Sequence, residues 1–144
     1  MAISYKPSRY HSITPYLTVR DGDQTIRFLQ AAFGAETTEI LRLSNGRFLH
    51  GEMKIGDSHI MIGEARGDWR PRPNQLYLYV PDTEGTYKQA LEAGGKSLME
   101  PADMFWGDRS AGIEDPDGNW WWIATHIEDV TGEELQRRAI AARG

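Results

Sequence analysis

The sequence predicts an α+β domain built from two β-α-β-β-β modules, and three observations support this. β-branched and aromatic runs alternate with amphipathic helical segments in the order strand, helix and three strands. The same order recurs about 61 residues further along the chain. Turns rich in glycine, asparagine and aspartate separate the elements. The length of 144 residues suits one domain, or two small halves that share a core.

The first module is predicted to span about residues 12–66. Its strands are expected at Ile13–Val19, 36–43, 47–55 and 58–64. A helix is predicted over residues 23–33, because apolar side chains recur there at helical spacing and Gly34 is suited to end it. Asn45-Gly46 is a strong hairpin signal between the second and third strands.

A proline-rich linker, residues 67–74, is predicted to lead into a second module over about 75–127. Its strands are expected at Gln75–Val80, 95–99, 109–114 and 119–125. A helix should run from a cap at Asp82 or Thr83 to Ala93. Glu100 to Gly107 is predicted to be a loop. Thr131 and Glu134 have the spacing of a capping box, which predicts a C-terminal helix over about 131–142.

The two modules align at a nearly constant offset. Tyr16 precedes Tyr77 by 61 positions, and Ile62 precedes Ile123 by the same number. Identities between the halves are few, so the alternative is an α+β domain without a repeat. The matching order of strand, helix, glycine and turn favours a duplicated unit.

Composition excludes several classes of protein. The chain has no cysteine, which excludes disulfides, a cysteine nucleophile and an iron–sulfur cluster and fits a cytoplasmic location. Its net charge is −5, and it has no basic run, so we expect no nucleic-acid partner. No apolar stretch has the length of a membrane span, so we expect no membrane partner.

Several runs resemble the vicinal oxygen chelate (glyoxalase/bleomycin resistance/dioxygenase) superfamily. They are Ile13–Val19, Phe33–Glu36, Ile55–Asp57 and the turn Asp115-Pro-Asp-Gly118. Trp106–Arg109 and Trp122–Asp129 resemble, more narrowly, the PhnB-like subgroup. The resemblance covers about residues 12–128. It implies two modules that form a curved mixed sheet around a cavity. It also implies a homodimer.

Metal-dependent members of this superfamily hold one divalent ion with side chains from the first and last strand of each module. The resemblance places those positions at Thr14, Met61, Gln75 and Trp122. Methionine and tryptophan do not ligate a hard cation, so we expect no metal cofactor. The alternative is a divalent metal held by displaced residues, namely His50, Glu52, His59 and Glu64.

Without a metal, the same cavity is predicted to be an aromatic pocket for a small-molecule ligand. The candidate lining residues are Thr14, Tyr16, Met61, Gln75, Tyr77, Tyr79, Trp106, Arg109, Trp120 and Trp122. The alternative is that the aromatic side chains only fill the interior. Arg109 can bind a ligand anion, or pair with Asp108, Asp115 or Glu114.

His50 and Glu52 lie two residues apart on a predicted strand and therefore face the same side. They are the candidate catalytic acid–base pair, and the alternative is a solvated strand face. The sequence thus favours a small-molecule-binding protein. The alternatives are a lyase, isomerase or dioxygenase of the same superfamily, with or without a metal, and a dimeric interaction module.

Overall fold

The computed structural model describes residues 2–143, which form eight strands and three helices. The strands are β1 (Tyr16–Val19), β2 (Glu36–Arg42), β3 (Phe48–Ile55), β4 (Ser58–Glu64), β5 (Gln75–Tyr79), β6 (Lys96–Asp103), β7 (Asp108–Glu114) and β8 (Trp120–His126). The helices are α1 (Gly22–Phe33), α2 (Thr83–Glu92) and α3 (Gly132–Arg143). This order confirms two β-α-β-β-β modules followed by a C-terminal helix.

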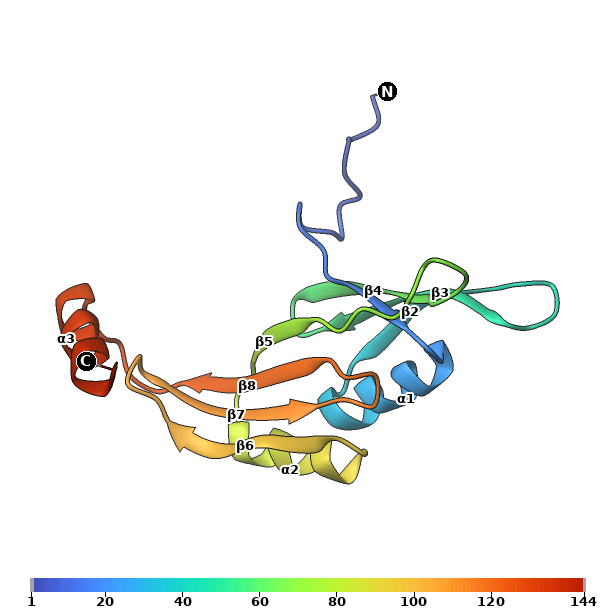
Figure 1. Cartoon of the computed structure of the whole chain (residues 1–144). Helices are drawn as coiled ribbons and strands as arrows, with labels where there is room; N and C mark the ends of the chain where they lie inside the picture. The colour runs from blue at the N-terminus through green and yellow to red at the C-terminus, as the bar shows by residue number, and fades with distance from the viewer. Residues whose placement is uncertain (1, 144) are drawn as a thin grey trace.

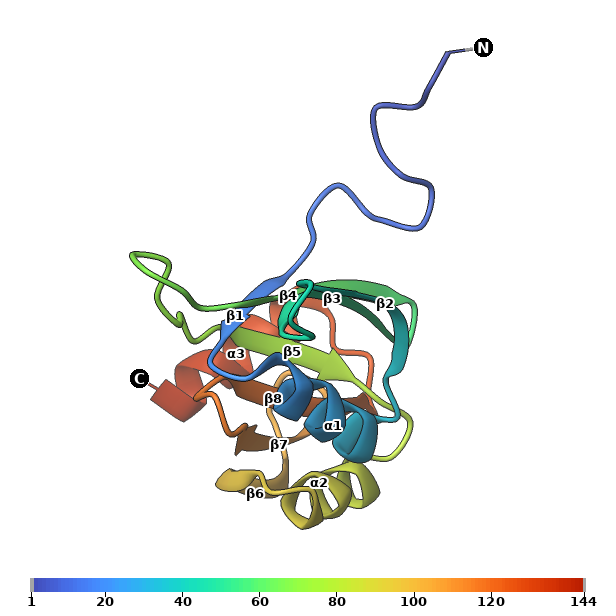
Figure 2. The same ribbon diagram turned by 90° about the vertical axis from the view of Figure 1, so that its right-hand side faces the viewer.

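Each module forms its own four-stranded mixed sheet. The strand orders are β1-β4-β3-β2 and β5-β8-β7-β6. The first strand of each module pairs in parallel with the last, and the remaining pairs are antiparallel. Figures 1 and 2 show the first sheet above the second, and α1 lies beside α2. The predicted α+β class is therefore confirmed.

The strand registers confirm the internal repeat. Tyr16 lies opposite Met61 in the first sheet, and Tyr77 lies opposite Trp122 in the second. Both members of the second pair follow those of the first by 61 positions. Because side chains alternate between the two faces of a strand, equal registers give the two sheets equivalent faces.

One hydrophobic core joins the two modules. Leu17, Ile62 and Ile123 are fully buried, and the Trp121 side chain is 2% exposed. Their neighbours along the strands point the other way. On the second module this leaves a face, here called the open face, that carries Gln75, Tyr77, Tyr79, Trp120 and Trp122. The predicted alternation thus separates core residues from candidate ligand contacts.

The Asp-Pro-Asp-Gly turn connects the modules. Asp117 accepts a 2.8 Å hydrogen bond from the Thr25 hydroxyl of α1 and one of 3.2 Å from the Arg20 amide. Asp115 is 5% exposed and accepts hydrogen bonds from the Trp121 indole and from both the backbone and side chain of Asn119. Burial raises the pKa of Asp115 despite these donors. The turn is therefore a structural element of the core.

The prediction of a loop from Glu100 is wrong, because β6 continues to Asp103. Ala102 and Asp103 pair with the beginning of β7. Pro101 has no amide hydrogen, which usually ends a strand. Here β6 is the edge of its sheet and its register shifts between Met99 and Ala102, and edge strands and bulges tolerate proline.

The predicted cap at Asp82 is confirmed, because its carboxylate accepts from the Gly85 amide at the start of α2. Gly34 ends α1 at a φ of 64°, as predicted, and Asp21, which the sequence did not single out as a cap, accepts from the Gln24 amide at the start of that helix. The Thr131 hydroxyl accepts from the Glu134 amide at 3.3 Å, at the start of α3. Figure 1 shows α3 beyond the end of the second sheet, and this helix has no buried residue among those described.

Within residues 2–143, no helix combines the length and the apolar character that crossing a lipid bilayer requires.

Candidate functional site

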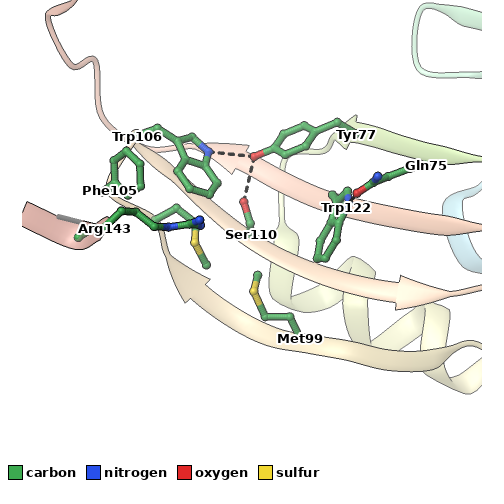
Figure 3. Close-up of a pocket in the computed structure, with 10 residues that line it drawn as sticks. Gln75, Tyr77, Met99, Phe105, Trp106, Ser110, Trp122 and Arg143 are labelled. Carbon is green, nitrogen blue, oxygen red and sulfur yellow. Dashed lines mark hydrogen bonds between the residues drawn. The ribbon is translucent and has the colours of Figure 1, made fainter. Parts of the chain in front are cut away.

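A pocket of about 490 Å³ lies on the open face of the second module, next to α3 (Figure 3). Its lining residues are Gln75, Tyr77, Met99, Met104, Phe105, Trp106, Ser110, Trp122, Ala142 and Arg143. Most of these side chains are aromatic or carry a thioether. The pocket is therefore a mainly apolar cavity with few polar groups, as is typical of small-molecule sites.

Strand alternation places four of these residues together. Gln75 and Tyr77 come from β5, Ser110 from β7 and Trp122 from β8. Gly112 lies opposite Trp122, and a Cβ built at this glycine would come within 2.5 Å of the indole. A glycine inside the strand thus gives the indole room to lie over β7.

The segment between β6 and β7 forms another wall of the pocket. The Phe105 and Trp106 rings are perpendicular, with centroids 5.0 Å apart. The Trp106 indole nitrogen donates to the Tyr77 hydroxyl at 3.2 Å, which ties this segment to the floor of the pocket. The end of α3 lies beside it, and the Arg143 side chain extends from that helix toward the pocket (Figure 3).

The polar tips in the pocket mostly bind one another. The Tyr77 hydroxyl donates to Asp108 at 2.7 Å and lies 3.0 Å from the Ser110 hydroxyl. Because the phenol proton goes to Asp108, the serine is the donor in the second bond. The Trp122 indole nitrogen donates to the Gln75 side-chain oxygen at 2.6 Å. These bonds hold the aromatic rings in fixed positions.

Asp108 lies behind the pocket and is 2% exposed. Its carboxylate accepts hydrogen bonds from Tyr77, Tyr79 at 2.9 Å and His126 Nδ1 at 2.9 Å. Burial alone would raise the pKa of Asp108, but these three donors outweigh burial and hold the pKa below its ordinary value. Asp108 is therefore an anion at the beginning of β7 that binds β5 and the end of β8.

The partners of Asp108 have shifted pKa values too. Burial, assisted by Asp108, raises the pKa of Tyr77, and the hydrogen bond to Asp108 raises the pKa of Tyr79. Hydrogen bonds to Asp108 and Asp129 raise the pKa of His126. Both phenols therefore stay protonated near neutral pH, and neither presents a base to the pocket.

The structure brings together part of the predicted cavity. Gln75, Tyr77, Trp106 and Trp122 line the pocket, and their contact with a ligand stays a prediction. Tyr79 and Trp120 are on the same open face but outside the lining, and the Trp120 indole donates to Glu114 at 3.0 Å. The remaining candidates on strands or strand ends of module one do not line this pocket; they are Thr14, Tyr16 and Met61.

Arg109 is placed on the other face of β7 from Asp108 and Ser110 and does not line the pocket. It binds Asp103 through two hydrogen bonds of 2.7 and 3.3 Å. The predicted pairing with Asp108, Asp115 or Glu114 is therefore wrong. The reason is the register, since Asp103 lies opposite Arg109 on the neighbouring edge strand.

Glu52 is enclosed by the N-terminal arm. The residue is 2% exposed, and its carboxylate accepts hydrogen bonds from Arg9 at 2.8 Å, from the Tyr10 hydroxyl and from Thr38 at 2.9 Å. The Arg9 hydrogen bond is the main reason that the pKa of Glu52 falls to about 2. The alternative prediction, that Glu52 lies on a solvated strand face, is therefore wrong. The His50 ring lies 5.8 Å from the Tyr16 ring, and its acid–base role stays a prediction.

The superfamily's metal positions do not carry a fitting set of ligands. The side-chain oxygen of Gln75 is the best potential metal ligand at these four positions. It already accepts a hydrogen bond from the indole of Trp122, which occupies another of the positions. Met61 offers a thioether, and the Thr14 hydroxyl bonds to a backbone oxygen. Among residues 2–143, no cluster of three or more His, Asp or Glu side chains is arranged to hold a metal ion.

The alternative metal ligands have other surroundings. Glu64 accepts from the Gly22 amide at 2.9 Å and lies 3.5 Å from Arg47. His59 packs beside Tyr10, and its Nδ1 atom is buried without a partner among the described residues.

Several residues in or behind the pocket were not predicted from the sequence. They are Ser110, Met99, Arg143 and the Asp108–His126 pair behind the pocket. One signal was available: in β7, Asp108, Ser110 and Gly112 alternate with Arg109, Ala111 and Ile113. The small and polar residues of that pattern mark the open face.

Comparisons with known proteins agree with this fold. The family model described as Glyoxalase/Bleomycin resistance protein/Dioxygenase superfamily matches residues 9–123. The uncharacterized protein Mb0911c of Mycobacterium bovis is 26% identical, over all of this chain and 99% of its own length.

Two solved structures show the same fold. The crystal structure of TioX from Micromonospora sp. ML1 matches with a TM-score of 0.70 and 19% identity, over 81% of this chain and 99% of TioX. A superfamily member from Sphaerobacter thermophilus matches with a TM-score of 0.62 and 21% identity, over 80% of this chain and 98% of its own. With four-fifths of the chain inside the matched family model, the protein belongs to the glyoxalase/bleomycin resistance protein/dioxygenase (vicinal oxygen chelate) superfamily.

Proposed function

We propose that this protein is a metal-independent small-molecule-binding member of its superfamily, with the ligand seated in the pocket of the second module. The observation that carries the proposal is the pocket itself. It has a volume of about 490 Å³, within the range of small-molecule sites, and its walls are aromatic and thioether side chains. Aromatic side chains give large contact areas at a small cost in conformational entropy.

The hydrogen bonds around the pocket favour binding over catalysis. A general base needs a free acceptor at hydrogen-bond distance from the ligand. Asp108 is buried behind Tyr77 and is already bound to three donors. The raised pKa of Tyr77 keeps its phenol neutral. Asp108 and Tyr77 therefore hold the aromatic walls in position through their hydrogen bonds.

Independence from a metal is part of the proposal. It is supported by the side chains at the superfamily positions, which include a thioether and an indole. It is supported further by the Trp122–Gln75 hydrogen bond, which occupies the amide oxygen that a cation would need.

We further propose membership of the PhnB-like subgroup and a cytoplasmic location. The subgroup resemblance rests on Trp106–Arg109 and Trp122–Asp129. These runs supply two aromatic walls of the pocket and the Asp108–His126 pair behind it. The absence of cysteine fits a reducing compartment.

The proposal includes a homodimer. Tyr16 is 42% exposed, Tyr79 is 61% exposed and Trp120 is 41% exposed. These aromatic side chains lie on sheet faces that the protein's own helices leave open, and a second copy would cover them. Sedimentation velocity should give the mass of two chains, and a single-chain mass at micromolar concentration would contradict this part of the proposal.

The binding function is tested with a neutral fluorescent probe, N-phenyl-1-naphthylamine. We expect saturable binding with one site per chain and a dissociation constant in the micromolar range. Trp122→Ala removes a wall of the pocket and should weaken binding about tenfold or more. Trp69→Ala is the matched control, because Trp69 is 60% exposed in the linker and does not line the pocket. Absence of saturable binding, or equal effects of the two variants, would refute the proposal.

A further inference from the structure

We infer that the ligand of this pocket is an apolar molecule that carries one acidic group, and that Arg143 selects the acid. The inference rests on the proposed binding function and specifies its ligand class. It follows from which hydrogen-bonding groups of the pocket are already occupied and which are free.

The occupied groups leave mainly donors for a ligand. The Tyr77 hydroxyl and the indole nitrogens of Trp106 and Trp122 all have partners within the protein. The oxygen of Gln75 is also occupied, whereas its nitrogen has no hydrogen-bond partner among residues 2–143. A ligand that meets free N–H donors in an otherwise apolar pocket must offer acceptors to them.

Among residues 2–143, Arg143 is the one charged side chain that lines this pocket. The other arginines of α3 are engaged: Arg137 binds Glu134, and Arg138 binds Glu134 and Glu128. Arg143 has no carboxylate within ion-pair distance in the described part of the chain. Its guanidinium therefore keeps its donors for a carboxylate or a similar planar anion.

The charge of one carboxylate behind the pocket is partly compensated by its hydrogen-bond donors. Asp108 is the buried carboxylate behind Tyr77, and both phenols and His126 donate to it. The raised pKa of His126 favours its cationic form beside that carboxylate. The apolar walls meanwhile limit screening by water, which strengthens the attraction between Arg143 and an acid.

Arg143 depends on Arg138 for its position. α3 has no buried residue among those described, so its attachment relies on polar contacts. Arg138 donates to the Phe105 backbone oxygen at 3.0 Å and to both carboxylate oxygens of Glu128 at 2.8 and 2.9 Å. Arg138 is therefore a positioning residue that keeps the end of α3 beside the pocket.

The test compares two probes that differ in charge, 2-naphthoate and 2-naphthamide, by isothermal titration calorimetry at pH 7.5. We expect the protein to bind the carboxylate about tenfold more tightly, as suits a charge-assisted pair at a partly open site. Arg143→Gln should reduce naphthoate affinity to that of the amide and leave naphthamide unchanged. Arg143→Lys should retain part of the preference, and added salt should weaken naphthoate binding only.

Arg138→Met should lower the preference for naphthoate, and the double variant with Arg143→Gln should lose no more than Arg143→Gln alone. Additive losses would refute the positioning role. Arg137→Gln is the matched control and should bind both probes normally. Equal affinity of the two probes, or an equal loss of both in Arg143→Gln, would overturn the inference. The neutral probe N-phenyl-1-naphthylamine separates the two failures, because its binding to wild type upholds the binding function even when the acid preference is absent.

Discussion

The Trp122 indole nitrogen donates a 2.6 Å hydrogen bond to the side-chain oxygen of Gln75, on the neighbouring parallel strand. The resemblance to the superfamily places two metal-binding positions at these residues, and here the two side chains bind each other. The indole also becomes a fixed wall of the pocket.

Metal content tests this relationship directly. Protein purified without chelator or a metal-affinity tag should contain near-zero Zn, Ni, Mn, Fe and Co by mass spectrometry, before and after soaking in each ion. The reason is that methionine and tryptophan do not bind such cations in place of carboxylate or imidazole. Close to one ion per chain, lost in His59→Ala or Glu64→Gln, would show that displaced residues hold a metal.

Asp115→Ala should destabilise the fold by about 2–4 kcal/mol, because it leaves several buried donors without an acceptor. These donors are the Asp117 and Asn119 amides and the Trp121 indole. Urea unfolding followed by tryptophan fluorescence measures the loss. Asp57→Ala, in the exposed turn of the first module, is the control and should change stability by no more than about 0.5 kcal/mol. Similar losses in both variants would contradict the structural role.

Glu52 should stabilise the protein in a pH-dependent manner. Its pKa falls from 4.5 to about 2 on folding, so its contribution is present above pH 4.5 and is lost as the pH falls toward about 2. Glu52→Gln should therefore reduce the free energy of unfolding by about 1–3 kcal/mol at pH 7, with a gap to wild type that narrows on acidification. Glu36→Gln, on an exposed position of β2, is the control. A gap that stays constant from pH 7 to pH 3 would be inconsistent with this assignment.

The His126 imidazole should titrate above its ordinary pKa of 6.5, because it binds Asp108 and Asp129. A histidine with a raised folded pKa stabilises the protein fully below pH 6.5, and this contribution is lost as the pH rises through the folded pKa. NMR titration of the ring nitrogens measures the shift. Asp108→Asn should lower the His126 pKa, whereas Asp103→Asn, which faces Arg109, should not. An unchanged His126 pKa in Asp108→Asn would rule out this coupling.

Part of the candidate site followed from local sequence. Alternation in β5 and β8 put Gln75, Tyr77 and Trp122 on one face, and the structure places all three in the pocket. Trp106 was also among the predicted lining residues, and it lies in the pocket. Arg109 was also a candidate lining residue, but it lies outside the pocket and binds Asp103 on the neighbouring strand. That pairing depends on the register between two strands, which the sequence of a single strand does not encode.

The N-terminal arm shows why other contacts stayed hidden. Arg9 and Glu52 are 43 positions apart, and each alone has the appearance of a solvated charge in the sequence. Only the folded chain brings them together and buries the carboxylate. Asp108 is similar, because its phenol partners come from a strand about thirty positions earlier.

The sequence by itself determined the order of elements, the repeat of 61 positions and the division of each strand into a core side and an open side. Those properties depend on neighbours within a few residues, where helical and strand periodicity act. The tertiary structure decided that Glu52 is enclosed, that Asp108 joins Tyr77 to His126 and that α3 brings Arg143 to the pocket. Such contacts join distant parts of the chain, and they exist only once the core has fixed the positions of both sheets.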